Sequence, residues 1–192
     1  MDIQAHKKIL ITGGVRSGKS RYAMNLALSY PAPRIFVATA EALDEGMRER
    51  IAKHQAERKG DFLTVEEPVH LAASFRRLEV QPAIVVVDCL TVWINNLLYH
   101  FSGKDEEVQK EIQDLIEEVQ RLQFPMIFVT NEVGLGVMPE NPLARRYMDQ
   151  LGAVNQSFAA LCDEVVMMIS GIPQGVKGTR NDANMDQPVA KY

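Results

Sequence analysis

The sequence predicts an α/β protein whose open, mostly parallel sheet carries helices on both faces. Short apolar runs alternate along the chain with segments of helical periodicity. The runs are continuous in hydrophobicity, which is typical of strands buried on both faces of a parallel sheet. The first run also leads into a glycine-rich segment that opens a helix, as in nucleotide-binding α/β folds. The expected strands are 8–12, 34–38, 83–88, 125–130 and 164–170.

Helical patterns occupy the intervals between these runs. Alternating strands and helices imply right-handed crossover connections, which place helices on both sides of the sheet. No internal repeat divides the chain. The expected helices are 18–29, 43–59, 69–79, 91–101, 105–123 and 142–161.

Length and composition limit the class of protein. The chain has 192 residues, of which 46% are hydrophobic and 24% charged, as in ordinary globular domains. Its net charge of −4 argues against a nucleic-acid partner. No apolar run approaches the ~20 residues that span a bilayer, and the first residues lack the apolar core of a signal peptide. Cys89 and Cys162 lie in apolar runs and indicate buried thiols. We therefore expect a cytoplasmic protein without a membrane span.

The chain is expected to form a single nucleotide-binding domain over residues 1–192, with a core at about 8–173. Beyond Pro173 few side chains are apolar, so residues 174–192 are expected to be a tail that is mobile or docked on a neighbour. On this basis, deleting 174–192 should leave the fold intact.

The segment "GGVRSGKS" fits the pattern G-x-x-x-x-G-K-[ST] between a strand and a helix. Backbone N–H groups of such a loop wrap a polyphosphate, and the helix N-terminus adds the positive end of its dipole. Lys19 would reach the β- and γ-phosphates, and the Ser20 hydroxyl would bind Mg²⁺. A chance match in a glycine-rich turn is the alternative, but the strand before and the helix after favour a P-loop NTPase-like fold. The predicted nucleotide-binding residues are Gly13, Gly14, Val15, Arg16, Ser17, Gly18, Lys19 and Ser20.

Further polar residues follow the later strands, and ligands of open α/β sheets bind at the carboxyl ends of strands. Asp88 ends the third expected strand and is the natural acid for a bound metal, although it could instead cap the next helix. Thr130, Asn131 and Glu132 follow the fourth, where they could face phosphates or substrate, or cap a helix. No N-K-x-D element is visible, so the spacing does not distinguish adenine from guanine.

His54 lies in an unusual setting on the expected helix 43–59. Arg50, His54 and Arg58 are spaced by four residues and form a stripe beside an apolar one. The two guanidinium groups would lower the imidazole pKa and favour the neutral, nucleophilic form. They would also attract a polyphosphate. From spacing alone, an ordinary solvated helix face is the better explanation of the pattern.

Five segments together resemble the bifunctional adenosylcobinamide kinase / adenosylcobinamide-phosphate guanylyltransferase family. The phosphate loop has the family's R-S-G-K-S form followed by Arg, and a second segment has its R-I-x-x-H core with a later Arg and T-x-E. The matching segments occur in the family's order and cover about residues 8–173. They are "ILITGGVRSGKSRYA", "RIAKHQAERKGDFLTVEEP", "VVVDCLTVWINNLL", "VTNEVGLGVMPENPLARRYMDQLGAVNQ" and "DEVVMMISGIP".

The resemblance implies two reactions: phosphorylation of adenosylcobinamide by a nucleoside triphosphate, then transfer of GMP from GTP to the adenosylcobinamide phosphate. It further implies a guanylyl intermediate on His54, with Lys19 as the second catalytic residue. Mg²⁺ would be bound by Ser20 and Asp88, and ATP and GTP would be substrates. Arg58, Glu66 and Asp88 would contact the nucleotide. A homo-oligomer, a trimer by analogy with the family, is also implied.

Two other functions fit parts of the pattern. A P-loop small-molecule kinase with a single reaction would need the loop but no histidine nucleophile, although no arginine-rich lid is evident. A RecA-like, nucleotide-driven module would act on DNA or on a protein partner. The acidic balance of the chain counts against the DNA-binding form of this alternative.

Overall fold

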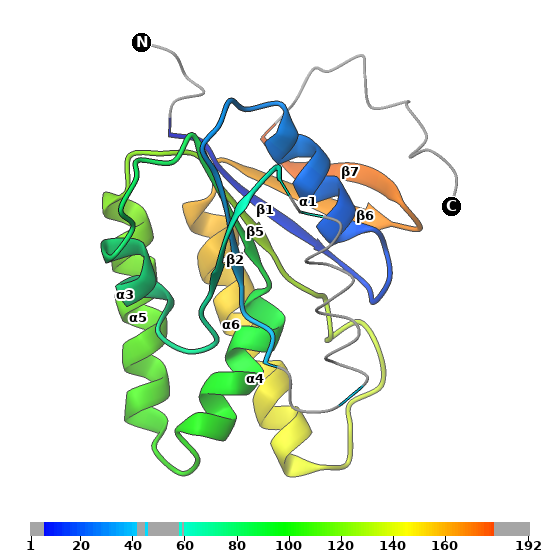
Figure 1. Cartoon of the computed structure of the whole chain (residues 1–192). Coiled ribbons are helices and arrows are strands. Elements are labelled where there is room, and N and C mark those ends of the chain that lie inside the picture. The colour runs from blue at the N-terminus through cyan, green and yellow to red at the C-terminus, as the bar shows by residue number, and fades with distance from the viewer. Residues whose placement is uncertain (1–5, 42–44, 46–57, 59, 179–192) are drawn as a thin grey trace.

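A computed structural model of the chain describes residues 6–41, 45, 58 and 60–178. These residues form one seven-stranded sheet with the strand order β3-β2-β4-β5-β1-β6-β7 (Figure 1). Every neighbouring pair is parallel except β6 and β7, which are antiparallel. The strands are β1 Lys8–Gly13, β2 Arg34–Ala38, β3 Leu63–Glu66, β4 Ile84–Asp88, β5 Met126–Val129, β6 Glu164–Ile169 and β7 Ile172–Lys177.

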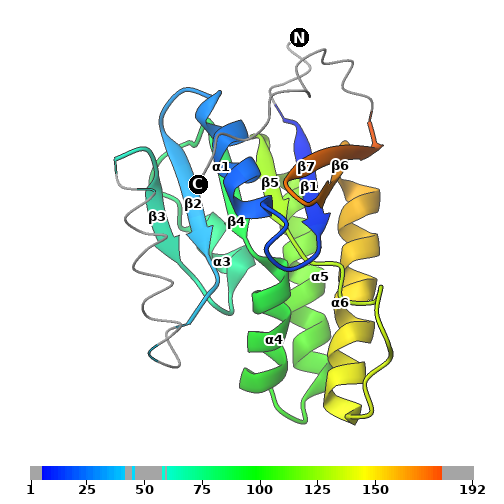
Figure 2. The same ribbon diagram turned by 90° about the vertical axis from the view of Figure 1, so that its right-hand side faces the viewer.

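Helices lie on both faces of this sheet, as the sequence predicts. Helix α1 covers one face, whereas α3, α4, α5 and α6 lie on the other (Figures 1 and 2). The predicted helix 43–59 lies outside the described residues except for 45 and 58. The helices are α1 Lys19–Leu28, α3 Leu71–Arg76, α4 Leu90–His100, α5 Asp105–Arg121 and α6 Pro142–Leu161.

The two faces of β4 illustrate why the buried strands read as continuous apolar runs. Ile84 and Val86 pack in the cluster that contains Ala23 of α1, whereas alternate residues of the strand face the larger helical layer. Residues 84–87 all have an exposed fraction of 0%. A strand covered on both sides needs apolar residues at every position, and this explains the absence of alternation.

Strand β3 is not among the five expected strands. It forms the edge of the sheet beside β2, and Leu63, Thr64 and Glu66 are exposed while Val65 is half-buried. An edge strand with so little buried surface carries no apolar run in the sequence. Its backbone pairing with β2, rather than its side chains, defines it.

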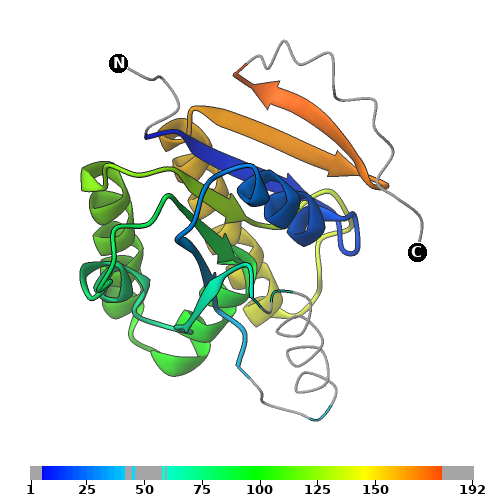
Figure 3. The same ribbon diagram turned by 45° about the horizontal axis from the view of Figure 1, so that its top comes forward.

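Strand β7 extends the sheet beyond residue 173, where the core was expected to end. Residues 172–177 pair antiparallel with β6, on the outer side of that strand (Figure 3). The ammonium group of Lys177 donates hydrogen bonds to the carbonyl oxygens of Ala159 at 2.8 Å, Ala160 at 2.9 Å and Cys162 at 2.6 Å. It thereby satisfies carbonyls at the C-terminus of α6, where a cation is favoured. The first residues of the expected tail are thus part of the fold.

This pairing changes the expected effect of truncation. A chain ending at residue 173 loses four of the six residues of β7, Lys177 among them. We expect its free energy of unfolding to fall by about 2 kcal/mol or more because several backbone hydrogen bonds disappear. A chain ending at residue 178 keeps the whole strand and should match the full chain within about 0.5 kcal/mol. Urea unfolding of the three chains measures the difference. Equal stability of the two truncated chains would contradict the structural role of β7.

Lys177→Met tests the helix-capping contact by itself. Methionine keeps much of the aliphatic length but has no ammonium group, so α6 should lose its three carbonyl contacts and the protein about 1 kcal/mol of stability. Lys110→Met is the matched control, because Lys110 is an exposed lysine whose partner is Asp114, one turn away on α5. Its loss should change stability by less than about 0.5 kcal/mol. A similar effect of both substitutions in urea unfolding would argue against capping by Lys177.

Candidate nucleotide-binding site

The predicted phosphate-binding loop joins the end of β1 to the start of α1. A hydrogen bond from the Ser17 N–H to the Gly14 carbonyl, at 3.3 Å, closes a turn in its backbone. The Gly171 N–H, in the turn between β6 and β7, donates to the Ser17 carbonyl at 3.0 Å. Gly14, Val15 and Arg16 are exposed at the rim. The sequence predicted the loop, but it gave no sign that the β6–β7 turn supports it.

Gly13 must be glycine because two constraints meet there. Its φ of 143° is one that other residues rarely adopt, and a Cβ at this position would overlap the carbonyl oxygen of Met168 on β6. The strand can therefore run directly into the loop while staying hydrogen-bonded to its neighbour. The close approach fixes where the loop begins relative to the sheet.

Lys19 is held inside the loop rather than extended into solvent. Its side chain is buried, and its ammonium group donates to the Gly14 carbonyl at 2.5 Å and to the Ser17 hydroxyl at 3.4 Å. Helix α1 begins at Lys19, and its N-cap is Gly18, which makes no side-chain cap. The first-turn N–H groups and the ammonium group together form a positive site of the kind that binds phosphate.

The parallel register aligns the carboxyl ends of the strands in one row. Glu66 of β3 is paired with Ala38 of β2, which is paired with Asp88 of β4; the row continues through Val129 of β5 to Ile11 of β1. Strand β5 therefore separates Asp88 from the strand that carries the loop. Glu66 lies farther out, at the edge of the sheet, and is exposed.

The backbone after Asp88 is held in place by Thr39, the residue that follows β2. The Thr39 hydroxyl accepts from the Cys89 N–H at 2.8 Å and donates to the Cys89 carbonyl at 2.9 Å. The Cys89 thiol caps α4 by accepting from the Val92 N–H. Burial, and secondarily the charge of Asp88, raise the pKa of this thiol to about 12. Cys89 is thus a structural, protonated thiol and not a nucleophile.

The loop after β5 contains a carboxylate beside the start of the phosphate loop. The Thr12 hydroxyl donates to Glu132 Oε1 at 2.6 Å, and the Glu132 N–H donates to the Gly13 carbonyl at 3.2 Å. Thr130, Asn131 and Glu132 were the residues expected near phosphates, and of these Glu132 lies beside the phosphate loop. Thr130 does not, because it is fully buried and donates to Asn155 of α6 at 2.7 Å.

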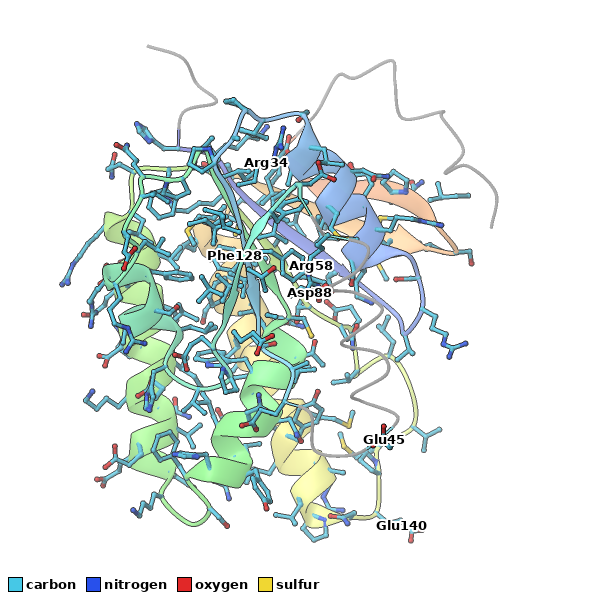
Figure 4. The ribbon with its side chains drawn as sticks, viewed as in Figure 1. Arg34, Glu45, Arg58, Asp88, Phe128 and Glu140 are labelled. Atoms are coloured by element: carbon cyan, nitrogen blue, oxygen red, sulfur yellow. The ribbon has the colours of Figure 1, made fainter. Side chains whose placement is uncertain are left out.

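Arg58 is buried against the face of the sheet that α1 covers. Its guanidinium carbon lies 3.9 Å from the centre of the Phe36 ring, and only 5% of the residue is exposed. Figure 4 labels Arg58 and Asp88 in the central part of the molecule. The cation stacked on an aromatic ring is a contact that spacing along a helix could not predict. Arg50 and His54 lie outside the described residues.

No dedicated metal cluster stands out in the part of the chain that the structure describes: no three His, Cys, Asp or Glu side chains there are grouped to hold a metal ion. This is compatible with magnesium at a phosphate loop, since Mg²⁺ takes one or two protein oxygens and completes its shell with phosphates and water. Within the same residues, no helix is long and apolar enough to cross a membrane.

A model of the family described as cobinamide kinase / cobinamide phosphate guanyltransferase matches residues 9–176. The chain belongs to this family. The bifunctional adenosylcobalamin biosynthesis protein CobP of Pseudomonas aeruginosa is 41% identical over 169 residues, which cover 88% of this chain and 96% of that protein. CobU proteins of the same description from Escherichia coli and Salmonella typhimurium are 38% and 40% identical, each over 88% of this chain and 98% of the relative. The family resemblance, the bifunctional kinase and guanylyltransferase class and the link to cobalamin biosynthesis predicted from the sequence are confirmed.

Solved structures of other proteins share the fold. They include the KaiC-like protein PH0186 of Pyrococcus horikoshii, with a TM-score of 0.51 and 15% identity over 85% of this chain and 71% of that one. The flagellar accessory protein FlaH of Methanocaldococcus jannaschii has a TM-score of 0.52 and 13% identity over 92% and 80% of the two chains. An ATPase from the type III secretion system of pathogenic bacteria has a TM-score of 0.53 and 13% identity over 85% of this chain and 51% of that one. At this identity the likeness supports the P-loop NTPase-like fold alone.

Lys19→Ala tests whether the loop binds phosphate. Loss of a buried ammonium group that can bond to a charged phosphate typically costs about 1.5–3 kcal/mol, so we expect the Kd for GTP to rise at least ~10-fold. Lys110→Ala, on the exposed face of α5, is the control and should leave the Kd unchanged within about twofold. Calorimetric titration measures both. An unchanged Kd in folded Lys19→Ala protein would place the nucleotide elsewhere.

Proposed function

We propose that this enzyme carries out both reactions of its family in sequence. In the first, the γ-phosphoryl group of ATP or GTP passes to the hydroxyl of the aminopropanol arm of adenosylcobinamide, releasing the nucleoside diphosphate. In the second, GMP passes from GTP to the resulting phosphate, giving adenosylcobinamide-GDP and pyrophosphate. The observation that supports this proposal is the family match over residues 9–176 together with a phosphate loop that joins β1 to α1.

The nucleotide is proposed to bind at Gly13 to Ser20. The loop amides and the N-terminus of α1 would hold the phosphates, and Lys19 would exchange its contacts with Gly14 and Ser17 for the β- and γ-phosphate oxygens. Phosphoryl transfer needs positioning and charge stabilisation more than covalent chemistry. A buried ammonium group at a helix N-terminus provides both.

Ser20 and Asp88 are the residues proposed to bind Mg²⁺. Ser20 lies in the first turn of α1, beside Lys19, and Asp88 ends β4, with β5 between that strand and β1. A hydroxyl and a carboxylate oxygen suit this hard cation, which otherwise prefers phosphate oxygens and water. When bound, the ion neutralises charge that develops on the phosphates.

Arg58 and Glu66 are proposed as further nucleotide contacts. The stacking of Arg58 on Phe36 fixes its guanidinium plane, so the cation can meet phosphate with little loss of side-chain entropy. Glu66 is exposed at the carboxyl end of β3 and could accept hydrogen bonds from ribose hydroxyls or a base amino group. Both assignments come from positions that match the family.

His54 is proposed to carry GMP between the two substrates. A neutral ring nitrogen would attack the α-phosphorus of GTP, form a P–N bond and displace pyrophosphate. A phosphate oxygen of adenosylcobinamide phosphate would then attack the same phosphorus and break that bond, which regenerates the histidine. Each step makes one bond to phosphorus and breaks one.

The wider setting follows from these substrates. We propose a cytoplasmic enzyme, because ATP and GTP are its phosphate sources, and a homotrimer by analogy with the family. Size-exclusion chromatography with light scattering measures the subunit number directly.

The experiment that tests the proposal is incubation with α-³²P-GTP followed by denaturing electrophoresis and peptide mapping. A guanylyl-histidine should appear as acid-labile, alkali-stable label on the peptide that contains residue 54. A kinase with a single reaction would phosphorylate adenosylcobinamide but retain no label. A RecA-like module would do neither.

His54→Ala should abolish labelling and GMP transfer, while phosphorylation of adenosylcobinamide falls by no more than a few-fold, because that step needs no histidine nucleophile. His54→Asn, which keeps size and polarity, should behave in the same way and thereby separates nucleophilicity from packing. Label on another residue, or transferase activity without any label, would contradict the assignment.

A further inference from the structure

Glu132 lies between the phosphate loop and strand β4, which carries the proposed magnesium ligand Asp88. Strand β5 lies between β1, which carries the loop, and β4, which ends at Asp88. Glu132 lies three residues beyond the end of β5, and its N–H donates to the carbonyl of Gly13, the first residue of the loop, at 3.2 Å. Glu132 is therefore at the part of the sheet edge next to the phosphate loop.

The carboxylate is oriented by one hydrogen bond that leaves its other oxygen available. The Thr12 hydroxyl, on a residue only 6% exposed, donates to Oε1 at 2.6 Å. Within the described part of the chain, Oε2 accepts no hydrogen bond that would compete with a substrate. Glu132 is half-buried, so the site is accessible from one side.

The backbone immediately before Glu132 is held by hydrogen bonds to α4 and α6. Asn155 of α6 accepts from the buried Thr130 hydroxyl at 2.7 Å and donates to the Asn131 carbonyl at 3.0 Å. The Thr91 hydroxyl of α4 accepts from the Asn131 N–H at 2.7 Å. The residues immediately before Glu132 are thus hydrogen-bonded to two helices, which preorganises the carboxylate.

Phosphorylation of an alcohol requires a group that accepts the hydroxyl proton. Asp88 has its proposed role at the metal, and Glu66 lies on the edge strand β3, beyond β2 and β4 as seen from the loop. We propose that Glu132 is the general base of the kinase reaction, an inference that depends on the proposed function. The substrate hydroxyl oxygen bonds to the γ-phosphorus as the β–γ bridging bond breaks. Its proton passes to Glu132 Oε2, and the nucleoside diphosphate leaves with the bridging oxygen.

This role separates the two reactions of the enzyme. The acceptor of GMP is a phosphate, which is largely ionised at neutral pH and has no hydroxyl proton to lose in the attack. The kinase step alone should therefore depend on the charge of residue 132. A residue that only supported the phosphate loop would affect both reactions, because both use the loop.

Glu132→Gln is the variant that distinguishes a base from a structural acceptor. Its amide oxygen can still accept from Thr12, so the loop keeps its support, but the side chain cannot take a proton. We expect kcat for adenosylcobinamide phosphorylation to fall by ~10²–10⁴-fold. KM for ATP, the melting temperature and covalent labelling by GTP should change by no more than a few-fold or a few degrees.

Thr12→Val is the matched control, because it removes the hydrogen bond but keeps the carboxylate. It should lower kcat of the kinase reaction much less than Glu132→Gln does. Unchanged kinase activity in Glu132→Gln would exclude the base role, as would equal losses of phosphorylation and GTP labelling. Wild-type protein that is labelled by GTP but does not phosphorylate adenosylcobinamide would instead contradict the proposed function itself.

Discussion

The parallel pairing of β1 with β5 on one side and β6 on the other is the constraint on which the site depends. Against β6, the close approach of Gly13 to the Met168 carbonyl fixes the start of the phosphate loop, and the Gly171 amide supports its middle. Against β5, the same strand brings Thr12 to Glu132. A shift of one residue between β1 and β6 would remove the fit at Gly13, and a shift between β1 and β5 would separate Thr12 from Glu132.

Polar groups at the carboxyl edge are arranged in two layers with different tasks. The inner layer is neutral and fully hydrogen-bonded: Thr39, Thr91, Thr130 and Asn155 connect the strand ends to α4 and α6 or to one another. The outer layer consists of charged groups such as Lys19 at the proposed nucleotide site. Buried polar groups that are fully satisfied rigidify a structure, so the inner layer can hold the outer charges without large rearrangement.

The fold also relates this enzyme to proteins of other descriptions. KaiC-like, flagellar accessory and secretion ATPase structures share the fold at 13–15% identity, so the architecture alone does not identify the substrate. Function must be argued from the residues of the site and not from the scaffold. Among the described residues of this chain, Arg58 stacked on Phe36 and the Thr12–Glu132 pair are contacts of this kind.

The sequence by itself determined the features that depend on local patterns. The buried strands could be predicted because two-sided burial requires apolar residues at every position, and the phosphate loop because its glycines and Lys19 form a fixed pattern between a strand and a helix. The family could be predicted because its motifs occur in order over most of the chain. None of these features requires knowledge of which strands are neighbours.

Only the tertiary structure decided the contacts between residues far apart in the chain. Strands β3 and β7 are mostly exposed, so only their backbone pairing with β2 and β6 reveals them. Thr12 and Glu132 are 120 positions apart and meet because β5 inserts between β4 and β1. Side-chain periodicity reports whether a residue is buried but not which strand lies beside it, and this strand order is what brings a carboxylate to the phosphate loop.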